Sequence, residues 1–289
     1  MKKGTLESRR KRQPLIFLAP WLIGTAAFFL FPAIYSLIIS FSDLKNPSTF
    51  EMSFAGIKHY HYALFIDTGF VAYLIEILKT TLTQTPVIIV FSLFTAILMN
   101  RKMPGRGIFR TIFFLPVILG TGFVMQQLSA QGIQENAMKG VTGMILKDDI
   151  VMYLGTGGTQ FVEGLLSMIT QVFWRSGVQI VIFLAGLQKI PESLYEAACI
   201  DAASAWETLW YVTLPMMSPI ILLNTIFTFI DYFTDSQNIV IELIDYLMFT
   251  YARFEYAAAA GWLYFLLIFI ILGLAWLLLR PIIKNAEIS

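Results

Sequence analysis

Polar side chains recur at helical spacing inside an otherwise apolar run of the chain. At positions i, i+3, i+4, i+7 and i+8 stand Gln171, Trp174, Arg175, Val178 and Gln179, so three polar groups and an indole share one helical face. A guanidinium and two amides on one face can hydrogen-bond a hydroxyl-rich or anionic ligand. If the run crosses a membrane, the alternative is that Arg175 extends its long side chain to the lipid headgroups.

A second run carries a similar stripe. Asn224, Thr228, Asp231 and Asp235 are spaced by four, three and four residues, with Tyr232 beside them. Amide, hydroxyl and carboxylate groups next to an aromatic ring can hold a polar ligand. Polar contacts between packed helices explain the same stripe equally well.

Other kinds of chemistry lack their motifs. The sequence has no His-Glu-x-x-His, no Gly-x-Ser-x-Gly and no Gly-x-x-x-x-Gly-Lys, so we expect neither catalysis nor a bound cofactor. The single cysteine, Cys199, excludes an internal disulfide and a thiolate metal cluster. His59 and His61 form a pair without a neighbouring carboxylate in sequence, which predicts solvated or interfacial histidines rather than a metal site. The glycines of 155–158 predict a flexible loop.

The composition indicates a membrane protein. Of the 289 residues, 57% are hydrophobic and 13% are charged, against about 25% charged in average soluble proteins. The net charge of +1 excludes a nucleic-acid binder that relies on bulk positive charge. The high apolar content also excludes a disordered chain.

Six charge-poor runs are long enough to cross a bilayer, which takes about 20 apolar residues. They lie at 14–41, 80–100, 111–130, 161–188, 210–230 and 257–279. The first run follows a basic head but is about twice as long as the apolar region of a signal peptide, so we interpret it as a retained helix.

The distribution of Lys and Arg predicts the orientation, since cytoplasmic flanks collect these residues. Most of the 20 lie in the N-terminal head, in the second connection and near the C-terminus, which places both termini inside. We therefore expect an all-α membrane protein of six transmembrane helices, N-in and C-in. Its parts would be a basic cytoplasmic N-terminus (1–13), a six-helix domain (14–283) and a cytoplasmic tail (284–289).

An amphipathic stretch lies on the cytoplasmic side between the fourth and fifth runs. Pro191 and the adjacent Glu192 favour a short helix that ends near Ile200, and the Ser204 to Glu207 spacing is that of a capping box that starts a second helix. The chain must turn at 201–203. The short helix has two uses open to it: packing under its own bundle, or docking into a groove on a soluble partner.

The residues of this stretch resemble a known family. The run Glu196-Ala197-Ala198-x-x-Asp201-Ala202-Ala203, followed by Leu214-Pro215, resembles the EAA loop (about 189–215) of permease subunits in binding-protein-dependent ABC importers. The resemblance covers nearly the whole chain and is strongest to the carbohydrate-uptake branch. Further matches follow in order at Phe17-Leu18-Ala19-Pro20, Phe31-Pro32, Ser40-Phe41, 105–111, Phe114-Leu115-Pro116, 183–188, Ile190-Pro191, Pro219 and 254–259.

The resemblance implies roles for residues of the loop. The helix would sit in a cleft of a cytoplasmic ATPase, with Glu196 as the charged contact, Ala197 and Ala198 as small residues that permit close approach, and Asp201 at the polar end. The rigid connection into the fifth span would begin at Leu214-Pro215. The family usually has Gly where this chain has Ala202, and Ala costs about 1 to 2 kcal/mol in a left-handed turn.

The resemblance also implies partners and cargo. The chain would be a multi-pass protein of a bacterial or archaeal cell (inner) membrane, pairing with a second six-helix permease as a heterodimer. Two ATPase subunits would bind ATP and Mg, and an extracytoplasmic binding protein would deliver a carbohydrate. The expected substrate path comprises Gln171, Trp174, Arg175, Gln179, Asn224, Thr228, Asp231 and Tyr232. The alternatives are a permease for glycerol phosphate, polyamine or another polar nutrient, and an ion-coupled secondary transporter.

Overall fold

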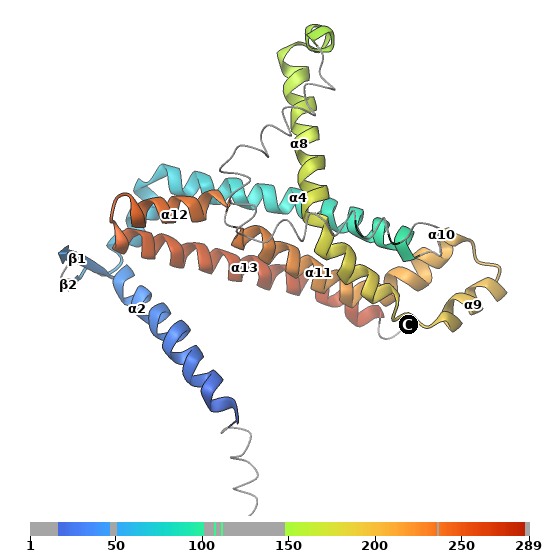
Figure 1. Ribbon diagram of the computed structural model, residues 1–289, viewed down its shortest axis with the longest axis horizontal. Coiled ribbons are helices and arrows are strands. Elements are labelled where there is room, and N and C mark those ends of the chain that lie inside the picture. The colour runs from blue at the N-terminus through green and yellow to red at the C-terminus, as the bar shows by residue number, and fades with distance from the viewer. Residues whose placement is uncertain are drawn as a thin grey trace, which may run out of the picture. The chain divides into compact units, whose positions relative to one another are not determined.

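A computed structural model describes residues 17–46, 51–100, 107, 111, 148–235 and 237–286 (Figure 1). These residues belong to two compact units, Met1–Glu76 with Gln237–Leu267, and Ile77–Ser236 with Ile268–Ser289. Five helical segments of the described chain are long and apolar enough to cross a membrane: Phe17–Ser40, Thr68–Asn100, Gly155–Leu187, Ala205–Phe249 and Phe254–Leu278. They correspond to five of the six predicted spans. The predicted span at 111–130 and most of the match at 105–111 lie outside the described residues, as do residues 1–16 and 287–289.

The described elements are nearly all helical. The α-helices are α2 (Phe31–Ser40), α3 (Lys58–His61), α4 (Thr68–Asn100), α8 (Asp148–Leu187), α9 (Glu192–Ile200), α10 (Ala205–Thr208), α11 (Leu214–Thr234), α12 (Ile239–Phe249) and α13 (Phe254–Ala286). Three π-helical turns are η1 (Ala26–Leu30), η2 (Tyr62–Ile66) and η3 (Leu209–Thr213), and two strands are β1 (Ser42–Asn46) and β2 (Glu51–Phe54).

The first unit holds a hairpin and the first turns of two long helices. The strands β1 and β2 pair antiparallel with Ser42 opposite Phe54, which adds a short hairpin that was not predicted to a chain that is otherwise mostly helical, as expected. The carboxylate of Asp67 caps α4, because its Oδ1 accepts from the backbone N–H of Gly69 at 3.0 Å and of Phe70 at 3.2 Å. Its Oδ2 accepts the hydroxyl of Tyr256, near the start of α13.

The second unit has a core formed by three helices. Ala96 and Met99 of α4, Phe183 of α8 and Met217 of α11 are buried together, and Ile88 of α4 packs with residues of α8 and α11 further along. The helices α8 and α11 also meet through polar side chains, including Arg175, Gln179 and Asn224. This packing positions the predicted stripes.

Two further features depart from the predictions, one in each unit. The glycines of 155–158 do not form a loop, because α8 runs through them with one break at Gly155, where φ is 65°. Only Gly tolerates this backbone without strain, so the residue permits a kink and the helix continues beyond it. The helix α12 after the fifth span was also not predicted, since its apolar residues resemble a continuation of that span.

Candidate functional site: a polar seam and an exposed cytoplasmic helix

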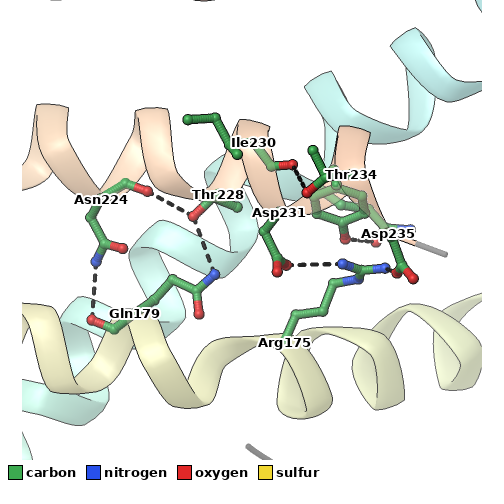
Figure 2. Close-up of polar contacts among 10 residues, drawn as sticks. Arg175, Gln179, Asn224, Thr228, Ile230, Asp231, Thr234 and Asp235 are labelled. Atoms are coloured by element: carbon green, nitrogen blue, oxygen red, sulfur yellow. Dashed lines mark hydrogen bonds and ion pairs between the residues drawn. The ribbon is translucent and has the colours of Figure 1, made fainter. Parts of the chain in front are cut away.

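A charged cluster joins α8 to α11. The guanidinium of Arg175 donates from Nη1 to Asp231 Oδ2 at 2.9 Å and from Nη2 to Asp235 Oδ2 (Figure 2). The side chain of Arg175 is 20% exposed and that of Asp231 is 39% exposed. Arg175 is therefore held by two carboxylates of the neighbouring helix.

An aromatic ring and a third helix complete the cluster. The Cζ atom of Arg175 lies 4.2 Å from the ring centroid of Tyr232, a cation–π distance. The hydroxyl of Tyr232 donates to Gln84 Oε1 of α4. The cluster thus combines side chains from α4, α8 and α11, and each of them contacts at least one other member of the cluster.

Uncharged polar groups lie between the same two helices. Together with the charged cluster they form what we call the polar seam. Asn224 Nδ2 donates to the backbone oxygen of Gln179 at 3.0 Å, and Gln179 Nε2 donates to Thr228 Oγ1 at 3.4 Å (Figure 2). The hydroxyl of Thr228 donates to the backbone oxygen of Asn224 at 2.8 Å. Both amide side chains are buried, Gln179 at 1% and Asn224 at 0% exposed.

The structure thus brings together six of the eight residues expected in the substrate path: Arg175, Gln179, Asn224, Thr228, Asp231 and Tyr232. Gln171 is exposed on α8 and Trp174 is half-buried there, and neither contributes a hydrogen bond described above. Asp235, the last residue of the predicted stripe, is a direct partner of Arg175. Gln84 was missed, and its signal is an amide among threonines near the start of the run 80–100. The substrate role of these residues stays a prediction.

The short helix α9 has one anchored face and one exposed face. Ala198 is buried at 8% exposure, and the hydroxyl of Tyr195 lies 3.4 Å from that of Thr213 in η3. Glu196 and Ala197 are exposed, and Ile200 is 85% exposed. Of the two predicted uses, packing under the bundle therefore accounts for one face and leaves the other without contacts inside the described chain. Ala198, expected on the docking face, lies on the packed one.

The turn after α9 takes the left-handed conformation that the sequence left open. Ala202 has φ of 56°, follows the exposed Asp201, and donates its N–H to the oxygen of Cys199 at 3.1 Å. The N–H of Ala203 donates to the oxygen of Ala198 at 2.9 Å. These two bonds form a Schellman motif whose left-handed position usually holds Gly, so Ala202 is strained there.

The start of the following helix matches its prediction. Ser204 and Glu207 form the expected capping box, in which Ser204 Oγ accepts the N–H of Glu207 at 3.3 Å and Glu207 Oε2 accepts the N–H of Ser204 at 2.7 Å. The half-buried Leu214 and Pro215 begin α11. A glycine of α8 allows α11 to approach closely, since a Cβ on Gly186 would lie 3.0 Å from atoms of Ile220 and Met217.

His59, one member of the predicted histidine pair, lies close to a carboxylate that is distant from it in sequence. His59 Nε2 lies 2.9 Å from Asp43 Oδ1, and Lys58 Nζ donates to Asp43 Oδ2 at 2.8 Å. The hydrogen bond from Lys58 and the charges of Lys58 and His59 lower the pKa of Asp43 below its ordinary value. In the described ranges no group of three or more His, Cys, Asp or Glu side chains is placed to hold a metal ion.

Comparison with known proteins identifies relatives over most of the chain. No family model matches. The arabinooligosaccharides transport system permease protein AraP of Bacillus subtilis (strain 168) is 32% identical, over 73% of this chain and 66% of that protein. The probable ABC transporter permease protein YesP of the same organism is 30% identical over 81% of this chain and 74% of its own length.

A solved structure has the same fold. A chain of the bacterial alginate ABC transporter, crystallised in complex with alginate pentasaccharide-bound periplasmic protein, superposes with a TM-score of 0.66. It is 18% identical, and the match covers 97% of this chain and 99% of that one. Together with the sequence relatives, this places the chain in the family of sugar ABC transporter permease proteins.

Proposed function

We propose that this chain is the membrane-spanning subunit of an ATP-driven importer that moves a carbohydrate into the cytoplasm. The observation that carries the proposal is α9, a helix anchored by Tyr195 and Ala198 on one face and exposed at Glu196, Ala197 and Ile200 on the other. An apolar side chain as exposed as Ile200, beside a carboxylate on a short helix, suits a groove on a soluble partner.

The partner that fits α9 is a cytoplasmic ATPase. Glu196 supplies the charged contact, Ala197 permits close approach, and Ile200 adds apolar area. Movement of the ATPase would reach α11 through the capped start of α10 at Ser204 and the rigid Leu214-Pro215 segment. ATP and Mg are bound by that partner, and this chain contributes no catalytic group.

The arrangement in the membrane follows from the charge distribution. Six spans with both termini in the cytoplasm put α9 on the same side as the ATPase. A second six-helix permease completes the translocation path, and two ATPase subunits lie beneath the pair. Transport proceeds by alternating access, in which rigid helix groups rock around a fixed site and ATP shifts the balance between two states.

The cargo is a carbohydrate delivered by an extracytoplasmic binding protein. Support comes from the AraP relative, named for arabinooligosaccharides, and from the alginate transporter, named for its complex with a saccharide-bound periplasmic protein. Polar side chains from α8 and α11 with the ring of Tyr232 are a suitable set of contacts for hydroxyl groups.

The test is ATPase activity of the complete complex. The chain is co-expressed with the second permease and ATPase encoded beside it, reconstituted in liposomes, and supplied with the neighbouring binding protein and a panel of neutral and acidic saccharides. Stimulation of ATP hydrolysis by one saccharide class, with uptake of that saccharide, supports the proposal. An intact complex that hydrolyses ATP and responds to glycerol phosphate or a polyamine instead would contradict the carbohydrate cargo.

A further inference from the structure

Among the described residues, the charged cluster between α8 and α11 holds more acidic than basic side chains. Arg175 there faces both Asp231 and Asp235. Both acidic residues lie in or at the end of an apolar segment that is long enough to span a membrane. An acidic side chain in such a segment faces a water-filled cavity or a partner, because lipid would not solvate it. Asp231 has Arg175 as such a partner, and 39% of its side chain stays exposed and can accept a further hydrogen bond.

The neighbouring polar groups show the same excess of acceptors. In the described part of the chain, the side-chain oxygens of Gln179 and Asn224 have no hydrogen-bond partner, although both residues are almost fully buried. Their side chains project into the space between α8 and α11 (Figure 2). A buried acceptor without a donor is unfavourable, so a donor arriving between the helices would be bound favourably.

A ligand for this seam must therefore bring donors and no negative charge. We propose, as a refinement that rests on the proposed function, that the seam of Asp231, Gln179 and Asn224 selects a neutral, hydroxyl-rich oligosaccharide and rejects acidic sugars. Each sugar hydroxyl donates one hydrogen bond, which suits the carboxylate of Asp231 and the two amide oxygens.

The role of Arg175 agrees with this selectivity. An acidic sugar would need a cation, but Arg175 already donates to Asp231 and Asp235 and stacks on Tyr232. The carboxylate of a uronic acid would lie close to two acidic side chains. The described residues of the seam offer no second cation to pair with it. The seam thereby disfavours phosphate-bearing cargo for the same reason.

Direct binding to the permease tests the inference without the selectivity of the binding protein. The assembled complex, purified without binding protein, is titrated with a neutral arabinooligosaccharide, an alginate oligosaccharide and the diamine putrescine, and Kd is measured by calorimetry. We expect the neutral saccharide to bind at least tenfold more tightly than the acidic one. Asp231→Asn should weaken binding of the neutral saccharide about tenfold and reduce the difference between its Kd and that of the acidic saccharide. Asp231→Glu should preserve the preference for the neutral saccharide.

Asp245→Asn is the matched control, since it removes the same charge from an exposed position of α12 and should leave every Kd unchanged. Equal binding of neutral and acidic saccharides by the unmodified complex would overturn the inference, and so would an unchanged preference in Asp231→Asn. Tighter binding of putrescine than of either saccharide would overturn it in favour of a cationic cargo.

The proposed function fails by a different result. If sugars stimulate ATP hydrolysis in the reconstituted system but none binds through Asp231, the inference is wrong and the importer stands. If no sugar stimulates a complex that hydrolyses ATP, the carbohydrate function itself is wrong.

Discussion

Arg175 Nη1 lies 2.9 Å from Asp231 Oδ2 across 56 residues of sequence, so one ion pair fixes the register of α8 against α11. Removing one member of a partly buried pair leaves the other without compensation. The stability of the second unit therefore depends on this cluster as a set.

Arg175→Ala is expected to lower the free energy of unfolding by about 3 kcal/mol, because two carboxylates lose their shared cation. Adding Asp231→Asn and Asp235→Asn should restore part of the loss. The measurement is the apparent Tm of the purified complex for each variant. A triple variant no more stable than Arg175→Ala would mean that the charges do not account for the loss.

Gly186→Val is expected to destabilise the packing of α8 on α11 by about 1 to 3 kcal/mol, since its Cβ would lie 3.0 Å from Ile220. Gly164→Val on the same helix is the control, because nothing lies within 4 Å of its Cβ position. Thermal unfolding of both variants should show a lower Tm for position 186 alone. Equal shifts would point to helix propensity as the cause.

Ala202→Gly is expected to stabilise the fold by about 1 kcal/mol, because glycine adopts a φ of 56° without a Cβ clash. Ala203→Gly adds the same flexibility at a neighbour that is not among the positive-φ residues, and should not stabilise. Both are compared by thermal unfolding of the complex. A gain at 203 that equals the gain at 202 would contradict the strain at Ala202.

Glu196→Lys is expected to leave the permease inserted and assembled but to lower substrate-stimulated ATP hydrolysis by tenfold or more, because the exposed carboxylate is the proposed contact to the ATPase. The same charge reversal in the hairpin, Glu51→Lys, serves as control and should preserve stimulation. Normal stimulation in Glu196→Lys would remove this residue from coupling.

Asp43 makes a small, pH-dependent contribution to stability. Its pKa is lowered in the fold, so the contribution is present above the ordinary value of 3.8 and is lost as pH falls through the lowered value. Because 64% of the Lys58 side chain and 37% of the Asp43 side chain are exposed, solvent screens the pair and the contribution is below about 1 kcal/mol. The Tm difference between the unmodified chain and Asp43→Asn should be positive at pH 6 and shrink as the pH falls below 3.8. A difference independent of pH would exclude the ion pair as its source.

Periodicity and capping rules predicted the elements that depend on local sequence. The end of α9 at Ile200, the turn at 201–203 and the capping box at Ser204 all follow from interactions within a few residues, and the structure confirms them. Five spans were predicted for the same reason, since length and apolar content are local properties.

The partners of polar side chains could not be predicted in this way. Helical spacing places Arg175 on a face, but it does not say which helix that face meets. The bond between Tyr232 and Gln84 joins residues 148 positions apart, and His59 finds Asp43 only because a hairpin folds back. The strands of that hairpin are short and polar, so they carry no alternating pattern.

One carboxylate in the first unit serves two helices at once. Asp67 caps the first turn of α4 with one oxygen and accepts the hydroxyl of Tyr256, near the start of α13, with the other. The starts of α4 and α13 are therefore joined at one carboxylate, and replacing Asp67 would remove a helix cap and an inter-helix hydrogen bond at the same time.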